Sequence, residues 1–143
     1  MSNTIKLKKY VDVINEYEAG DTIIPGQLVQ LVSDGTVQPH GTAGGVAEKA
    51  FALEDELQGK GIDDAYAEGD RVQVMYARPG DEVYAFLKEA SSITVGEFLE
   101  SAGDGSLQKY GTATAVETLF PIAVSLDTVA TAPANARIKV RIV

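Results

Sequence analysis

The chain contains no cysteine and no tryptophan, and it has one histidine in 143 residues. Without cysteine, neither a disulfide nor a thiolate nucleophile or thiolate metal site can be part of the structure. No stretch approaches the roughly 20 consecutive apolar residues that a membrane-spanning helix needs, so we expect a soluble protein without membrane contact. The first ten residues lack the apolar segment and cleavage site of a secretory signal, which favours synthesis in a cytoplasm.

Sequence motifs for catalysis, metals and nucleotides are also missing. No serine lies in a Gly-x-Ser-x-Gly context, and His40 stands at the exit of a predicted hairpin, where we expect a surface or loop histidine rather than a catalytic one. The carboxylates at 54–56 and 63–64 lack EF-hand spacing, and residues 41–45 lack the lysine of a phosphate loop. We therefore expect solvated loop acids and a protein that is not an enzyme and needs no cofactor or metal.

Charge is distributed unevenly along the chain. The formal net charge is −9, yet the first ten residues carry +3 from Lys6, Lys8 and Lys9, so the remainder carries −12. An acidic body argues against nucleic acid as a partner, because phosphate binding needs clustered lysine and arginine.

An internal repeat organises the sequence. Residues 26–43 return without a gap at 96–113, seventy positions later, with seven of eighteen positions identical. In each copy an apolar run leads into Asp-Gly and then into Thr or Ser and an apolar residue. Asp-Gly takes the positive φ values of a tight hairpin turn, so we predict two hairpins with tips at Asp34-Gly35 and Asp104-Gly105. The repeat thus indicates a duplicated β unit.

The remaining segments predict short strands joined by Gly, Pro and Asp turns, with no extended helical periodicity. These strands are expected at residues 10–17, 50–54, 71–77, 82–87, 121–126 and 137–143. Residues 55–69 are expected to form a surface loop with one helical turn at 63–67. In the seventy-residue register, residues 82–87 fall on 12–17, with Val13 over Val83.

We therefore expect an all-β fold, either a small β-barrel or a sandwich, built from two internally repeated halves. An extended N-terminal arm without strand structure should cover residues 1–10. A single β domain should cover 11–143, with pseudo-repeats at about 11–80 and 81–143.

Two basic features, the N-terminal arm and the final strand, suggest surfaces for association. The final strand alternates strictly, which places Ile138, Val140 and Ile142 inward and the basic residues between them outward. Basic side chains on an acidic protein suit contact with an acidic neighbouring strand or subunit, although ion pairs within the monomer explain those of the final strand equally simply. For the lysines of the N-terminal arm the alternative is a solvated terminus, which is the more frequent outcome for a short basic end. The candidate capsid or subunit contact residues are Lys6, Lys8, Lys9, Tyr10, Arg137, Lys139 and Arg141.

Several turn-and-strand motifs resemble those of one protein family. The segments are Ala-Gly-Asp-Thr-Ile-Ile-Pro-Gly-Gln-Leu-Val-Gln-Leu (19–31), the acidic loop at 53–66, Gly-Asp-Arg-Val (69–72) and Val-Gly-Glu-Phe-Leu-Glu-Ser-Ala-Gly-Asp-Gly (95–105). Together they are similar to head decoration, or capsid cement, proteins of tailed bacteriophages, and the similarity covers most of the chain.

The resemblance implies a structural virion protein that binds the exterior of the expanded capsid, often as a homotrimer, and stabilises the lattice. Its partner would be the major capsid protein, and it would pass through the host cytoplasm during assembly. The alternative is a small β module that binds carbohydrate or peptide, or a tail or baseplate component. Such a module would use exposed aromatics, for which the candidates are Tyr66, Tyr76, Tyr84 and Tyr110.

Overall fold

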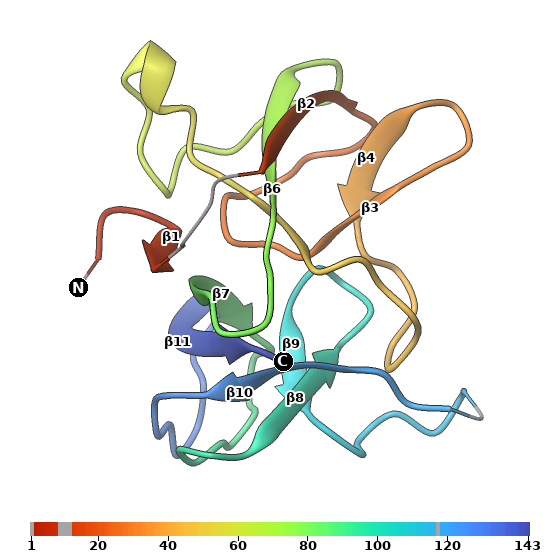
Figure 1. Cartoon of the computed structure of the whole chain (residues 1–143), viewed down its shortest axis with the longest axis vertical. Coiled ribbons are helices and arrows are strands. Elements are labelled where there is room, and N and C mark those ends of the chain that lie inside the picture. Colours follow the sequence, from red (N-terminus) through yellow and green to blue (C-terminus); the bar gives the residue numbers. More distant parts are fainter. Residues whose placement is uncertain (1, 9–12, 117) are drawn as a thin grey trace.

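A computed structural model describes residues 2–8, 13–116 and 118–143 (Figure 1). Short strands dominate the described chain, with one 3-10 helix, η1 (Glu56–Gln58), so the expected all-β fold is confirmed. The strands are β1 (Lys6–Lys8), β2 (Ile14–Ala19), β3 (Val29–Leu31), β4 (Thr36–Pro39), β5 (Ala50–Ala52), β6 (Arg71–Tyr76), β7 (Glu82–Leu87), β8 (Phe98–Ser101), β9 (Leu107–Lys109), β10 (Pro121–Ser125) and β11 (Ala136–Ile142).

The two halves of the chain repeat one strand order. In the first half the sheet runs β3-β4-β2-β6-β5, and in the second half the strands that pair run β8-β9-β7-β11-β10. Each half contains one parallel pair, β2 with β4 and β7 with β9, and its other neighbouring strands are antiparallel. Pairing of β10 with β8 closes the second half into a five-stranded barrel. In the first half, the ends of the sheet meet at a single bridge between Leu28 and Phe51.

Both predicted hairpins are confirmed, and their registers agree to the residue. Leu31 pairs with Val37 in the first hairpin, and Ser101 pairs with Leu107 in the second, an offset of seventy in both strands. At each tip the aspartate accepts a hydrogen bond from the backbone N–H two residues later, and both of these bonds measure 3.0 Å. This turn chemistry is local, which is why the sequence predicts it well.

The two turn glycines differ in what surrounds them, and this difference gives a matched test. Gly35 and Gly105 have φ values of 85° and 86°, but a Cβ at Gly35 meets nothing within 4 Å, whereas one at Gly105 comes within 3.0 Å of Pro39 and 3.2 Å of Gln27. Gly35→Ala should lower the free energy of unfolding by about 1 kcal/mol, from the left-handed backbone alone. Gly105→Ala should lower it by about 2–4 kcal/mol, because overpacking adds to the backbone strain. Urea unfolding of both variants measures the difference, and equal losses would contradict the asymmetry.

The expected alignment of β2 with β7 is wrong by two residues. Ala19 pairs with Val37, and Leu87 pairs with Leu107, so the equivalent of Val83 is Asn15 rather than Val13. The cause is the connection that follows each strand. Ala19 and Val29 lie 10 positions apart, whereas Leu87 and Leu99 lie 12 apart.

The larger apolar cluster crosses the boundary between the halves. It includes Leu28, Phe51 and Met75 from the first half together with Leu99 and Ile138 from the second. Backbone bonds also cross the boundary, because the N–H of Leu28 donates to the carbonyl of Gly105 at 2.8 Å. The packing of each half therefore depends on the other.

The N-terminal segment contains a strand, contrary to expectation. β1 pairs antiparallel with β7, where Lys6 lies opposite Val83, and the N–H of Tyr84 donates to the carbonyl of Ile5 at 2.8 Å. Ile5 is completely buried, and its own N–H donates to a carboxylate oxygen of Glu54 at 3.1 Å. One apolar anchor and a distant acceptor thus hold the segment, and neither is visible as local periodicity.

The connection between β5 and β6 is more anchored than a surface loop. The expected helical turn at 63–67 is absent from this described segment, and η1 lies earlier. Tyr66 is buried, forms a bridge with Ile23 and donates its hydroxyl to the carbonyl of Leu53 at 2.7 Å. Glu54 and Asp55 are buried as well, so these two acids are not the solvated loop residues that we expected.

Alkaline pH should weaken the fold through Tyr66. Burial raises the pKa of Tyr66 to about 12, whereas an unfolded tyrosine ionises near pH 10. The stabilising contribution of this neutral phenol is therefore complete below pH 10 and is lost as the pH rises from 10 towards 12. Urea unfolding at pH 9 and pH 11.5 should show a larger loss of stability for the wild type than for Tyr66→Phe. The same loss in both proteins would contradict this assignment.

Candidate interaction surface

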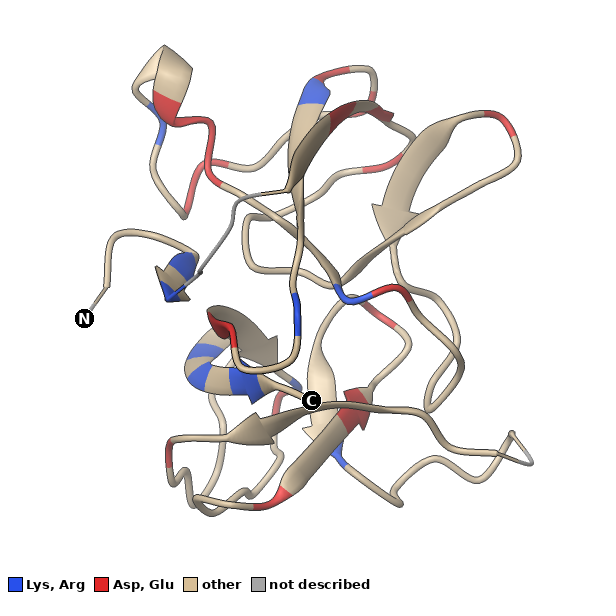
Figure 2. Ribbon diagram, viewed as in Figure 1, with Lys and Arg blue, Asp and Glu red and all other residues tan. Residues whose placement is uncertain are grey.

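The structure brings three of the predicted contact residues onto one surface. Glu82 on β7 pairs with Lys8 of β1 on one side and with Arg141 of β11 on the other. Cross-strand partners point to the same face of a sheet, so these side chains form one row. Lys139 lies two residues from Arg141 on the same face of β11, and the side chains of Lys8, Lys139 and Arg141 are exposed. We name these three residues the basic face, and Figure 2 shows the blue segments of β1 and β11 that carry them.

Ion pairs within the chain compensate the basic face only weakly. The Nζ of Lys8 lies 3.5 Å from a carboxylate oxygen of Glu82, and the Nζ of Lys139 lies 4.0 Å from one of Asp127. The side chains of Lys8 and Lys139 are 75% and 54% exposed, and exposed pairs of this kind contribute about 0–1 kcal/mol each. Both lysines thus remain accessible to a partner.

Two other predicted contact residues, Lys6 and Arg137, stand apart from the basic face. Lys6 belongs to β1 and is half-buried, opposite Val83. Lys9 and Tyr10 lie outside the described residues. Arg137 belongs to β11, but its side chain is 8% exposed and points into the first half of the chain.

Arg137 joins the two halves. Its guanidinium lies 4.5 Å from the ring centre of Phe86 and donates to the carbonyl oxygens of Pro25, at 3.2 and 3.3 Å, and of Ile62, at 2.5 Å. It also donates to Asp63 at 2.9 Å, where the carboxylate is 89% exposed. The alternation of the strand predicts the direction of this side chain, but the first half of the chain covers that end of β11.

A buried carboxylate holds the loop after the second hairpin. Glu100 is completely buried and accepts hydrogen bonds from Gln108 Nε2 at 3.1 Å, from Gly111 N at 3.3 Å and from Ala113 N at 2.7 Å. Its repeat counterpart, Gln30, accepts from the N–H of Gly41 at 3.0 Å in the same way. In the sequence, an acceptor side chain (Gln30 or Glu100) is followed eleven residues later by a glycine (Gly41 or Gly111) in both copies of the repeat. This signal was not recognised among the sequence predictions.

Glu100→Gln should lower the free energy of unfolding by about 1–3 kcal/mol, because the amide NH₂ would face a backbone donor and leave it unpaired. Gln30→Glu provides a matched control. It keeps an acceptor towards Gly41 at a half-buried position, and we expect a change within about 0.5 kcal/mol. Urea unfolding of both variants tests the assignment. A larger loss for Gln30→Glu would contradict it.

His40 lies in the connection after β4, so of the two expected places, surface or loop, the loop is confirmed and the surface is wrong. The residue is 3% exposed, with Nδ1 2.6 Å from the hydroxyl oxygen of Ser101 and Nε2 3.0 Å from the carbonyl oxygen of Val46. A carbonyl only accepts, so Nε2 carries the proton in neutral histidine, and Nδ1 accepts from Ser101. Ser101 is itself completely buried, and the pair therefore links β8 to the first half.

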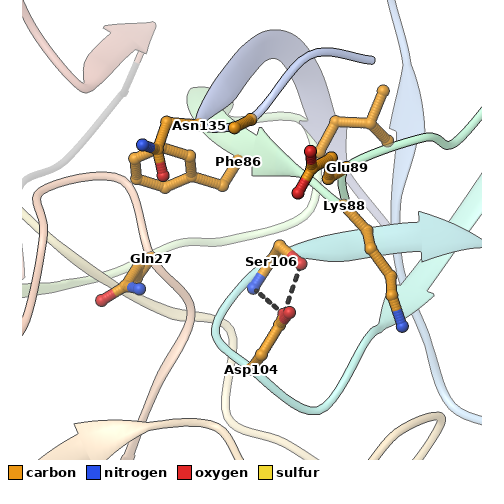
Figure 3. Close-up of a pocket in the computed structure, with 9 residues that line it drawn as sticks. Gln27, Phe86, Lys88, Glu89, Asp104, Ser106 and Asn135 are labelled. Carbon is orange, nitrogen blue, oxygen red and sulfur yellow. Dashed lines mark hydrogen bonds between the residues drawn. The ribbon is translucent and has the colours of Figure 1, made fainter. Parts of the chain in front are cut away.

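A small pocket opens between Gln27, which precedes the first hairpin, and the barrel of the second half (Figure 3). Its volume is about 170 Å³, and its lining includes Gln27, Glu89 and Asn135. Asp104 points towards it but is already used by the turn, because it accepts from the N–H and the hydroxyl of Ser106. Two of the polar side chains that line the pocket, Asp104 and Ser106, therefore stabilise the turn of the second hairpin.

The four candidate tyrosines do not form a common aromatic surface. Tyr66 is buried, and Tyr76 lies 2.5 Å from Tyr17, hydroxyl to hydroxyl. Tyr84 is half-buried on β7, whereas Tyr110 is 40% exposed at the end of the second hairpin.

Among residues 2–8, 13–116 and 118–143, no group of three or more His, Asp or Glu side chains is placed to hold a metal ion. The same described ranges contain no helix that is long and apolar enough to cross a membrane.

Comparison with known proteins identifies a shared fold. No protein-family model matches the chain, and no curated protein matches it significantly. Among solved structures, the chain is similar to the head fiber gp8.5 N base of bacteriophage phi29, with a TM-score of 0.59 and 13% sequence identity. The match covers 93% of this chain and 95% of that chain, so the two share their fold over almost their whole lengths.

Proposed function

We propose that this protein is a structural component of a bacteriophage head that binds the outer surface of the capsid and stabilises its lattice. The observation that carries the proposal is the fold shared with a phage head fiber base over 93% of this chain. The decoration-type motifs in the sequence point to the same class of virion protein. The protein would act by binding rather than by catalysis, outside the shell in the virion and in the host cytoplasm during assembly.

The major capsid protein is the proposed partner, and the basic face is the proposed contact. The protein is acidic, with a formal net charge of −9, so a cluster of exposed cations is distinctive on its surface. Such a cluster favours an acidic region of the shell and increases the rate of encounter with it. Arg137 does not belong to this contact, because its guanidinium is already bound within the chain.

Stabilisation of the lattice follows from mass action. A protein that binds the expanded lattice and not its unexpanded form shifts the equilibrium towards the expanded form. Attachment as a homotrimer would strengthen this effect, because three linked contacts hold better than one. Sedimentation equilibrium of the free protein measures its oligomeric state. A monomer at all concentrations would contradict the trimer.

Charge reversal tests the basic face. Lys139→Glu combined with Arg141→Glu should weaken binding to heads that lack this protein by at least about 10-fold. Lys60→Glu combined with Lys88→Glu is the matched control, because it changes the net charge by the same amount at exposed positions outside the basic face. We expect a change below about 3-fold for the control. Equal weakening by both pairs would mean that net charge, not the basic face, governs binding.

A further inference from the structure

The duplicated fold allows the two edges of equivalent strands to be compared. β2 and β7 each have six residues. The last residues of each strand pair in parallel with the second strand of the hairpin in the same half, β4 or β9. Glu16 is therefore the equivalent of Tyr84. In both strands, one edge is taken by an antiparallel neighbour, β6 or β11. The opposite edges differ.

The edge of β7 is filled along its length. The N–H of Tyr84 donates to Ile5, just before β1, at 2.8 Å, that of Phe86 donates to Gly26 at 3.4 Å, and that of Lys88 donates to Leu107 at 2.9 Å. The extended N-terminal segment, with buried Ile5 and the lysines Lys6 and Lys8, thus covers the first part of this edge of β7.

The same edge of β2 is filled only at its end. The N–H of Gly20 donates to Val37 at 2.8 Å, and pairing with β4 covers Glu18 and Ala19. The N–H of Ala19 donates to the other side, to Asp70, so the backbone groups of alternate residues point to opposite edges. Those of Ile14 and Glu16 therefore point to the β4 side. Among the described residues, none pairs with β2 on that side before Glu18.

The unpaired part of the edge is accessible and acidic. Ile14 is 39% exposed, and Glu16 and Glu18 are exposed on the same face of the strand. Residues 13–80 hold 12 acidic and 4 basic side chains, a formal net charge of −8. An added strand gains main-chain hydrogen bonds, and basic side chains on it would gain favourable contacts with Glu16.

We propose that the edge of β2 at residues 14–16 accepts an extended, lysine- or arginine-bearing segment of the capsid shell subunit. The segment adds to the sheet as β1 adds to β7, by backbone hydrogen bonds to Ile14 and Glu16. β1 shows that a three-residue strand with two lysines suits such an edge in this fold. This contact is separate from the basic face and rests on the proposed function, because the shell supplies the strand.

The test combines a backbone variant with hydrogen exchange. Glu16→Pro removes the backbone N–H of residue 16, which would donate a hydrogen bond to the added strand. Proline is tolerated at an edge position whose N–H faces solvent. It should weaken binding to expanded heads lacking this protein by at least about 10-fold. Glu16→Gln keeps the backbone and removes only the charge, and we expect at most about a 5-fold loss. Circular dichroism of the free variants checks that both are folded.

Amide hydrogen exchange of the wild-type protein tests the same contact without any substitution. The amides of Ile14 and Glu16 should exchange rapidly in the free protein and become protected on expanded heads. Unprotected amides together with normal binding by Glu16→Pro would overturn the inference and leave the proposed function intact. Failure of the wild type to bind heads would contradict the proposed function and remove the partner named here.

Discussion

Phe51→Ala is expected to lower the free energy of unfolding by about 3–5 kcal/mol, the largest effect of any substitution considered for this chain. Phe51 is completely buried in β5, pairs with Met75 and forms the bridge to Leu28 that joins the ends of the first sheet. Its ring belongs to the apolar cluster that spans both halves. Truncation removes buried apolar surface and leaves a cavity where the two halves meet.

Urea unfolding followed by far-ultraviolet circular dichroism measures this loss. Leu57→Ala is the matched control, because Leu57 lies in η1 and is 85% exposed. We expect that control to change stability by less than about 0.5 kcal/mol. A loss below about 1.5 kcal/mol for Phe51→Ala would contradict a core shared by the two halves.

Arg137→Met is expected to lower the free energy of unfolding by about 2–4 kcal/mol. Methionine keeps part of the packing against Phe86, but it leaves the carbonyl oxygens of Pro25 and Ile62 without the donors that they have in the wild type. Arg137→Lys should recover less than half of the loss, because an ammonium group cannot reproduce the planar fork of the guanidinium.

The ion pair with Asp63 contributes little to this effect. Its carboxylate is 89% exposed, so solvent screens the pair, and Asp63→Asn should change stability by less than about 1 kcal/mol. Urea unfolding of the three variants separates the two contributions. If Asp63→Asn cost as much as Arg137→Met, the ion pair rather than the carbonyl contacts would hold the halves together.

Local turn chemistry made part of this fold predictable. Asp34-Gly35 and Asp104-Gly105 specify their hairpins through the φ values of glycine and the side-chain acceptor of aspartate, which depend on a few adjacent residues. The final strand was predictable for the same reason, because the alternation at Ile138 and Val140 matches the pleat. The sequence left barrel and sandwich open, since it does not encode which strands meet at the closing edge.

Features that depend on contacts between residues distant in the chain could not be predicted from the sequence. β1 is three residues long and exists because β7 offers an edge some 75 positions away, so no local periodicity reveals it. Glu54 is buried because it accepts from the N–H of Ile5, and Arg137 is covered because the first half packs over that end of β11. In each case, tertiary contacts override an interpretation that local polarity favours.

The candidate surface was partly predictable from charge. Lys8, Lys139 and Arg141 were selected as separate features of the N-terminus and the final strand, and only the pairing of both with β7 brings them together. The unpaired edge of β2 could not be predicted, because it is recognised by comparison with the equivalent edge that β1 fills.

Co-sedimentation with phage heads tests the central claim most directly. Purified protein is titrated to saturation against expanded heads that lack it, and the titration is repeated with unexpanded heads. The account predicts saturable binding to expanded heads, at a stoichiometry that fits the symmetry of the lattice, and much weaker binding to unexpanded heads. Absence of binding to both kinds of head from the virus that encodes the chain would contradict it.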